Sequence, residues 1–301
     1  MKKSFPGTVI LPIVACLLWS TAFAGIKLGL PYTTPLHFAG VRFLLSGLMI
    51  LPFAGSYRTY GIVFRQNLKL VLLVSFLHIF FQYSMQYLGL SLVPAALGAI
   101  IIGSCPLFVA MVAHFNMPGD RLTMTKLSIF LVGIAGIVLV TIGRNEFAAF
   151  EEVGLLGIGL LLLVNIAIGI TNVIVARDSG FIPPLVLSSA SMLLGGLALF
   201  LVSLPIEGMT HDPKPPVYYG SLLWLSFVSA AAISIWFALL KLPEVKVSDL
   251  NFWKFIMPIA GAVIAWLIIP GEEPSLVAIS GMVVIALALV LLNIHKTRSV
   301  T

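Results

Sequence analysis

The sequence predicts an all-α polytopic membrane protein with ten transmembrane helices in two inverted five-helix repeats. Three observations lead to this prediction. Hydrophobic residues make up 60% of the chain and charged residues only 9%, whereas a soluble protein carries roughly 25% charged residues. Apolar runs of about 20 residues, the length that crosses a bilayer, follow one another with short polar connections. The fourth and ninth of these runs also share a pattern of turn and proline residues.

The apolar runs are expected to be helices, because only helices and closed barrels satisfy their backbone in lipid and strand-like alternation is lacking. The predicted spans are 7–29, 35–54, 68–90, 92–115, 125–143, 153–176, 183–205, 217–240, 247–269 and 275–294. The first run resembles a signal peptide with Ala22-Phe23-Ala24 as a cleavage site. Its apolar stretch is too long for that, and cleavage would remove one helix of the repeat, so we expect an uncleaved span.

The internal duplication is clearest around the two equivalent prolines. The matched positions, all at one constant interval, are Pro106 and Pro258, Gly119-Asp120 and Gly271-Glu272, and Thr123 and Ser275. With an odd number of spans per half, the second half must enter the membrane from the opposite side. We therefore expect an inverted repeat with halves at 1–146 and 147–301. Secondary transporters use this design, with a substrate site near the bilayer midplane.

Lysine and arginine predict the orientation, since these residues are enriched in cytoplasmic loops. With the N-terminus in the cytoplasm, only Arg144 and Lys214 lie on the outer side. The cytoplasmic side then holds Lys2, Lys3, Arg58, Arg65, Lys69, Arg121, Lys126, Arg177, Lys241, Lys246, Lys296 and Arg298. Both termini are therefore expected to be cytoplasmic.

Polar residues within apolar spans indicate a water-filled cavity or interhelical hydrogen bonds. Ser75, His78, Gln82 and Gln86 recur at helical spacing on one face, which favours a cavity wall. Pro106 and Pro258 each remove a backbone donor, so both helices are expected to kink beside the binding site. The candidate substrate-cavity residues are Trp19, Thr21, Arg42, His78, Gln82, Gln86, Ser104, Asn165, Trp236, Asn251 and Lys254.

Two cations, Arg42 and Lys254, lie well inside the predicted spans. Lys254 shares a helical face with Asn251 and Pro258, so we expect it to point inward. Because a buried cation otherwise lacks a partner, Lys254 is expected to face an anionic group such as a carboxylate. No acidic residue lies deep in a span, and proton coupling would therefore depend on His78 or His37.

Other classes of function find little support. No nucleophile-elbow, zinc-protease or nucleotide-binding motif is present, so we expect no enzyme and no cofactor, although an intramembrane enzyme stays an alternative. Cys16 and Cys105 lie inside apolar runs and predict neither a disulfide framework nor a metal site. The net charge of +6 comes from basic residues scattered singly, which indicates membrane orientation rather than nucleic-acid binding.

Several stretches together resemble EamA-type members of the drug/metabolite transporter superfamily. They are Leu17–Lys27, Arg42–Leu48, Pro106–Val109 and Gly119–Thr123. The resemblance covers nearly the whole chain. It implies ten helices in two repeats, an inner-membrane location and export of amino acids or other small metabolites. It also implies a central cavity lined by the first four spans of each half. The sequence departs from the family pattern at Gly271–Ser275 and around Pro258, where Asn251, Trp253 and Lys254 intrude.

We therefore expect a secondary transporter that exports a small organic metabolite, such as an amino acid, by alternating access around a midplane cavity. An importer or facilitator is the alternative within this class, and a membrane scaffold or sensor without transport is the alternative outside it. The expected partners are a small-molecule substrate and the lipid bilayer, without nucleic acid. Glycines at 133, 136, 195 and 196 are expected to serve packing within the chain, and we expect a monomer.

Overall fold

A computed structural model describes residues 7–92, 95–143, 155–208, 213–268 and 274–298, and every regular element in these ranges is a helix. The chain forms two compact units, each built from both halves of the sequence. Unit 1 comprises Met1–Tyr87 and Ile174–Glu244, and unit 2 comprises Leu88–Val173 and Val245–Thr301. The compact units thus cut across the predicted halves at 1–146 and 147–301, which stay a prediction.

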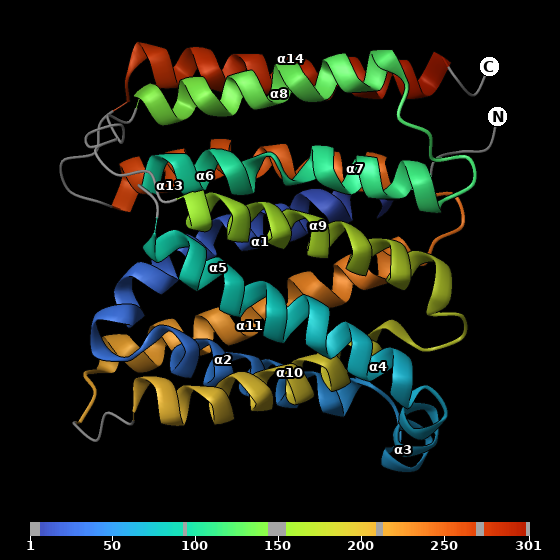
Figure 1. The fold of residues 1–301 in the computed structure, drawn as a ribbon, viewed down its shortest axis with the longest axis vertical. Helices are drawn as coiled ribbons and strands as arrows, with labels where there is room; N and C mark the ends of the chain where they lie inside the picture. The colour runs from blue at the N-terminus through green and yellow to red at the C-terminus, as the bar shows by residue number, and fades with distance from the viewer. Residues whose placement is uncertain (1–6, 93–94, 144–154, 209–212, 269–273, 299–301) are drawn as a thin grey trace. The chain divides into compact units, whose positions relative to one another are not determined.

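Unit 1 is a bundle in which α2 and α10 lie side by side (Figure 1). Its elements are α1 (Gly7–Gly29), η1 (Leu30–Tyr32), α2 (Pro35–Ile50), η2 (Leu51–Phe53), α3 (Tyr57–Gln66), α4 (Leu68–Val74), η3 (Ser75–Phe81), most of α5 (Gln82–Ser91), α10 (Pro184–Glu207) and α11 (Pro216–Leu240). A Cβ added to Gly196 would lie 2.8 Å from the Leu44 nitrogen, and one added to Gly40 would lie 2.6 Å from the Phe200 nitrogen. Glycine is therefore what lets these two backbones touch.

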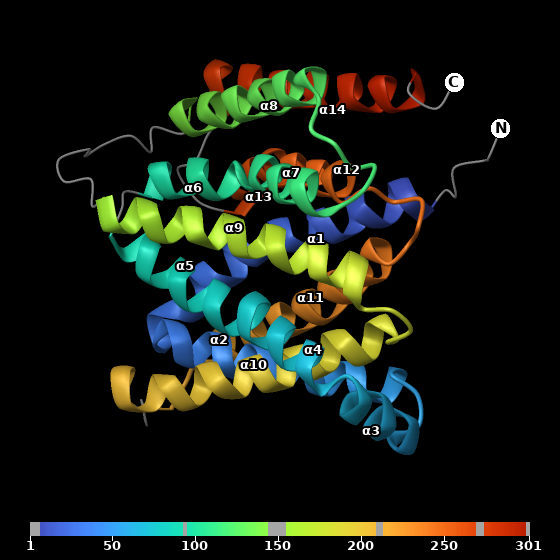
Figure 2. The same cartoon turned by 45° about the vertical axis from the view of Figure 1, so that its right-hand side comes forward.

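Unit 2 contains a second close pair, α8 and α14, which run side by side in both views (Figures 1 and 2). Its elements are α6 (Ala95–Gly103), α7 (Cys105–Asn116), α8 (Met124–Gly143), most of α9 (Leu155–Asp178), α12 (Val247–Phe252), η4 (Trp253–Phe255), α13 (Ile256–Ile268) and α14 (Leu276–Arg298). A Cβ on Gly281 would lie 2.6 Å from the Gly136 carbonyl oxygen. Phe130, Phe252 and Phe255 are fully buried or nearly so and form the aromatic centre of its core.

The helices agree with the predicted spans. Within the described residues, nine stretches are long and apolar enough to cross a membrane, and Leu276–Leu292 is a shorter apolar helix that corresponds to the last predicted span. The predicted fold class is therefore confirmed. One element was missed: α3, which the sequence analysis assigned to a connection, begins after Ser56, whose side chain accepts a hydrogen bond from the Thr59 nitrogen.

The repeat is visible in the way two equivalent helices begin. The Thr123 hydroxyl accepts a hydrogen bond from the Lys126 nitrogen at the start of α8, and the Ser275 hydroxyl accepts one from the Ala278 nitrogen at the start of α14. Both are N-cap bonds, which satisfy a backbone donor that the helix itself leaves free. Gly119, with φ +84°, forms the turn before the first cap. Its predicted counterpart, Gly271-Glu272, lies outside the described residues.

The third predicted span is not a uniform α-helix, because its centre, Ser75–Phe81, is a π-helix. A π turn accommodates one residue more than an α turn and is frequent at functional sites. The residues of the predicted polar stripe therefore face two different helices. The Ser75 backbone faces α10, since its carbonyl oxygen would lie 2.8 Å from a Cβ on Gly195, whereas His78 faces α11, where its ring lies 5.4 Å from that of Phe237.

Candidate functional site: polar groups buried at helix breaks

The predicted cavity residues are divided between the two compact units. Trp19, Thr21, Arg42, His78, Gln82, Gln86 and Trp236 belong to unit 1, and Ser104, Asn165, Asn251 and Lys254 belong to unit 2. Each group is described within its own unit. The single midplane cavity that the sequence predicts stays a prediction.

The first helix break of unit 2 separates α6 from α7 at Ser104, next to Pro106. Proline has no backbone N–H, so the helix cannot continue its hydrogen bonds through this point. Asn165, a fully buried residue of α9, donates from Nδ2 to the Ile101 carbonyl oxygen at 2.6 Å and to the Ser104 hydroxyl at 3.4 Å. The Asn165 Oδ1 atom has no hydrogen-bond partner. The buried Asn165 amide thus bonds to both residues at the break through Nδ2, and its Oδ1 atom is still available to accept a hydrogen bond.

The second break, at the equivalent place in the repeat, is η4 between α12 and α13, just before Pro258. Here the amides come in a pair: Asn172 of α9 donates from Nδ2 to Asn251 Oδ1 at 2.8 Å, and Asn251 donates to the Val247 carbonyl oxygen at 2.9 Å. Both side chains are buried. Because α12 also packs against α7, the two broken helices and the amide face of α9 form one polar layer in unit 2.

Lys254 lies half-buried in η4, and it is not without a partner in the structure. The sequence argument placed an anion opposite Lys254 because a buried cation would otherwise be uncompensated. The contact between Lys254 and an anionic group such as a carboxylate stays a prediction.

In unit 1 the predicted aromatic residues meet. The rings of Trp19 and Trp236 lie 5.1 Å apart between α1 and α11, and Trp236 is only 2% exposed. Thr21 is engaged in packing, because its hydroxyl donates to the Leu18 carbonyl oxygen at 2.7 Å and accepts from the Trp224 indole at 3.1 Å.

Two histidines of unit 1, His78 and His37, contact neighbouring side chains. His78 Nδ1 lies 3.1 Å from Gln82 Oε1, one turn further along the chain. Gln82 is buried and Gln86 is half-buried. His37, the other histidine considered for proton coupling, packs its ring 5.1 Å from that of Phe200.

Arg42 is the most buried cation among the residues of unit 1 whose side chains the structure describes, with 3% of its surface exposed. Its guanidinium carbon lies 4.4 Å from the ring centre of Phe43 and 5.3 Å from that of Tyr83. The Arg42 Nε atom has no hydrogen-bond partner. Its backbone is fixed instead, since the Arg42 carbonyl oxygen accepts from Ser46 at 2.7 Å and from Ser226 of α11 at 3.2 Å.

The sequence analysis missed several polar residues that the fold brings together. Tyr83 and Tyr87 were overlooked beside the glutamine stripe, although their spacing places both on one side of α5. A buried ion cluster was also missed; it consists of Asp120, Lys126, Ser248 and Asp249. Its members are far apart in the sequence, and only the Gly119-Asp120 turn signature marked one end of it.

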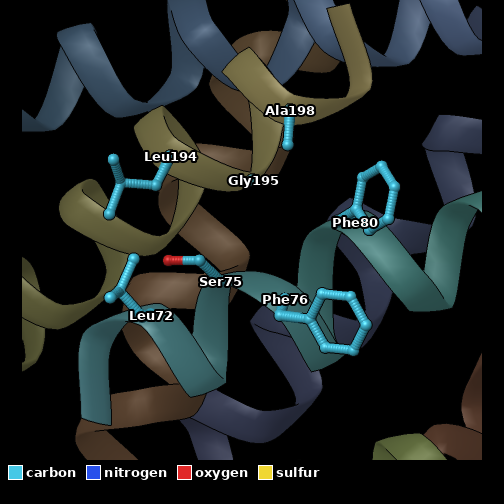
Figure 3. A pocket seen from close by; sticks show the side chains of 7 residues that line it. All are labelled: Leu72, Ser75, Phe76, Phe80, Leu194, Gly195 and Ala198. Atoms are coloured by element: carbon cyan, nitrogen blue, oxygen red, sulfur yellow. The ribbon is translucent and has the colours of Figure 1, made fainter. Parts of the chain in front are cut away.

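A separate pocket of unit 1 lies between α10 and the α4–η3 segment (Figure 3). Its volume is about 260 Å³, and Ser75 contributes the only polar side chain among the seven residues that line it. Phe76 and Leu72 in its wall are about half exposed. Ser75 is the one residue of the predicted polar stripe that lines this pocket, and none of the candidate substrate-cavity residues does. The apolar character of the pocket suits hydrocarbon rather than a polar metabolite.

Within the described residues no group of His, Cys, Asp and Glu side chains is suited to hold a metal ion. Cys16 and Cys105 are buried and form no disulfide with each other.

A chain of apolar helices in two similar halves, with buried amides at helix breaks, has the design of a membrane transporter rather than an enzyme. The EamA-like transporter family model matches residues 7–142 and 155–294. The chain therefore belongs to the EamA-like transporter family, within the drug/metabolite transporter superfamily, and it is a multi-pass membrane protein.

Similar proteins come from bacteria and a plant. The chain is 27% identical over 289 residues to a "Probable amino-acid metabolite efflux pump" of Salmonella typhimurium, covering 91% of each protein. It is 29% identical to a WAT1-related chloroplastic protein of Arabidopsis thaliana, of which it spans 66%. A solved crystal structure matches 99% of the chain with a TM-score of 0.82 at 18% identity, which supports the fold.

Proposed function

We propose that this EamA-family transporter exports a small organic metabolite, an amino acid or a related compound, across a bacterial inner membrane by alternating access. Both termini would lie in the cytoplasm, as the distribution of lysine and arginine indicates. The observation that carries the proposal is the pair of helix breaks in unit 2, each held by a buried asparagine of α9.

Broken helices serve transport for a physical reason. At a break the backbone carries polar groups that no helical bond satisfies, and these groups can bind a substrate or ion in an otherwise apolar medium. The Asn165 Oδ1 atom, fully buried and without a partner, is an acceptor of this kind. Burying a polar atom without a hydrogen bond is unfavourable, so a ligand donor that reached Oδ1 would bind favourably.

The relatives point to efflux. The proteins of Salmonella typhimurium and Escherichia coli that are similar to this chain along most of their length are named probable amino-acid metabolite efflux pumps. At 26–27% identity they support the direction and the general substrate class, while the particular substrate depends on side chains at the site.

Purified protein in liposomes tests the proposal. We expect counterflow of a radiolabelled amino acid into vesicles loaded with the same compound, identified beforehand by a screen for ligands that raise the thermal stability in detergent. In cells, overexpression should lower the internal level of that compound. A raised internal level would instead indicate an importer or facilitator.

The role of the break is tested by Asn165→Ala, with Asn116→Ala as the matched control. Both asparagines donate from Nδ2 to a backbone carbonyl, at 2.6 Å to Ile101 and at 2.8 Å to Val112, but Asn116 lies exposed at the end of α7. We expect Asn165→Ala to slow counterflow about tenfold, the effect of losing roughly 1.4 kcal/mol, and Asn116→Ala to leave it near the wild-type rate.

Accessibility separates transport from the scaffold alternative. Single cysteines at positions 82 and 104 should react with a water-soluble reagent from at least one side of the membrane, because a cavity must open to water in one of its states. If neither position reacts from either side, the proposal of a transport cavity is wrong.

A further inference from the structure

Arg42 presents an unusual charge balance for a residue inside a membrane span. It lies seven residues into α2, about 10 Å along the helix at the usual rise per residue, and it is 3% exposed. An arginine at such a position is costly in lipid unless it is paired or faces water, and it marks a functional site by default. The arginine guanidinium is not deprotonated in proteins as a rule, so the cost is met by partners rather than by loss of the charge.

The surroundings of Arg42 compensate the charge only in part. The faces of Phe43 and Tyr83 attract the guanidinium through cation–π contacts. No carboxylate of unit 1, among the residues that the structure describes, lies within ion-pairing distance of it. Glu207 is already used, because its two oxygens accept from the Leu36 and His37 nitrogens at the start of α2, at 3.0 Å each.

A second unpaired group lies near the guanidinium. The hydroxyl oxygen of Tyr87 is buried and has no hydrogen-bond partner. Tyr87 follows Tyr83, whose ring centre lies 5.3 Å from the guanidinium carbon of Arg42, by one turn of α5 on the same side of that helix. The N–H of Arg42 Nε and the O–H of Tyr87 are thus two buried donors of unit 1 without an acceptor.

We propose that Arg42 and Tyr87 bind the carboxylate group of the transported metabolite, with Tyr83 and Phe43 holding the guanidinium in place. A carboxylate supplies the missing negative charge and accepts from both donors at once. Its planar shape also suits the guanidinium fork, which binds carboxylates through two parallel hydrogen bonds. This inference rests on the proposed transport function and names the chemical group that the transporter would recognise.

The structure explains why this position holds its geometry without a ligand. The Ser46 and Ser226 hydroxyls fix the backbone of Arg42, and the Phe43 and Tyr83 rings, 4.6 Å apart, hold each other. A guanidinium oriented in advance loses little conformational freedom when it binds.

Matched pairs of compounds provide the test. The probes are L-amino acids and the corresponding amino-acid amides, which differ only in the carboxylate, and the readout is the ligand-dependent rise in melting temperature of protein in a non-ionic detergent. We expect at least one acid to stabilise the wild type and its amide to bind roughly 10- to 100-fold more weakly, as for the loss of a charge-assisted hydrogen bond. If no acid binds more tightly than its amide, the proposal is overturned.

The variants assign the effect to the residues. Arg42→Met should abolish the difference between acid and amide, and Tyr87→Phe, which keeps the ring and removes only the hydroxyl, should weaken acid binding roughly 5- to 10-fold. Arg65→Met, which removes an exposed arginine of α3, is the control and should behave as the wild type. If Arg42→Met does not fold, the Tyr87→Phe variant provides the test. Acid binding by this variant as tight as by the wild type would overturn the proposal.

Two further outcomes separate this inference from the proposed function. Counterflow of neutral or cationic compounds with no preference for carboxylates would overturn the carboxylate site and leave the transporter standing. Stabilisation by phosphatidylglycerol micelles that depends on Arg42, with none by any amino acid, would assign the site to a lipid phosphate and also overturn the proposal.

Discussion

Replacing Lys126 by methionine should destabilise the protein strongly, because Lys126 is the single cation of the buried ion cluster. Its Nζ lies 2.8 Å from Asp249 Oδ1, 2.9 Å from the Ser248 hydroxyl and 3.5 Å from Asp120 Oδ1. Asp120 also accepts from the Ser248 nitrogen at 2.8 Å. Lys126 is 6% exposed, and neither carboxylate is more than 8% exposed.

The magnitude follows from what the substitution leaves behind. Methionine fills much of the space of the lysine stem but leaves two carboxylates near each other with no cation between them. Removing one partner of a buried ion pair typically costs about 3–5 kcal/mol, because the remaining charge is buried without compensation. A loss of this size is roughly a third of a typical stability of about 5–15 kcal/mol.

The assay is unfolding by sodium dodecyl sulfate in mixed micelles, followed by tryptophan fluorescence. Arg121→Met is the control, since Arg121 lies close in sequence but is exposed, and a surface change of this kind stays within about 0.5 kcal/mol. Adding Asp249→Asn to Lys126→Met should recover part of the loss, since one uncompensated charge disappears. A Lys126→Met variant as stable as Arg121→Met would refute the reasoning.

Two further predictions concern packing and pH. Gly196→Ala places a Cβ 2.8 Å from the Leu44 nitrogen and should lower the free energy of unfolding by about 1–3 kcal/mol, because it forces α2 and α10 apart. Gly220→Ala is the control: its Cβ meets no atom within 4 Å, so the substitution should be neutral or stabilising by up to about 1 kcal/mol. Equal effects of the two substitutions in the same unfolding assay would contradict the packing argument. Burial lowers the pKa of Lys241 below its ordinary 10.5, so the folded protein releases this proton at a lower pH than the unfolded chain does. Stability should therefore gain a contribution as the pH rises through the lowered pKa toward 10.5, and Lys241→Met should lack this gain when unfolding is measured from pH 8 upward.

The spans and the repeat could be predicted because their causes are local. Hydrophobic runs of sufficient length determine where the chain crosses the bilayer, and the caps at Thr123 and Ser275 follow from residue types that bond to backbone N–H groups next to them. By contrast, α3 escaped prediction because its ten residues mix polar and apolar side chains and are too few to span a membrane.

The candidate site was harder to predict because its contacts are not local. The π-helix at Ser75–Phe81 changes the directions in which the polar side chains point, and no residue type in this segment predicts a π-helix. The sequence argument for a buried cation selected Lys254 on the evidence of one helical face, and the anionic partner of Lys254 stays a prediction. Which cation is buried without a carboxylate depends on neighbouring helices, and Arg42 is such a cation among the described residues of unit 1.

The ion cluster also bears on how a repeated chain can favour one of its two conformations. At the interval that relates the two halves, Ser248 and Asp249 correspond to Ala96 and Leu97, and Lys126 corresponds to Ala278. Asp120 has an acidic counterpart in Glu272, but the cation and the other two members of the cluster have apolar counterparts, so the sequence provides the ion pairs in only one of the two equivalent places. In an inverted repeat these places would lie toward opposite faces of the membrane. Alternating access around a central site would then exchange two states of unequal energy, because only one of them would have to separate buried charges.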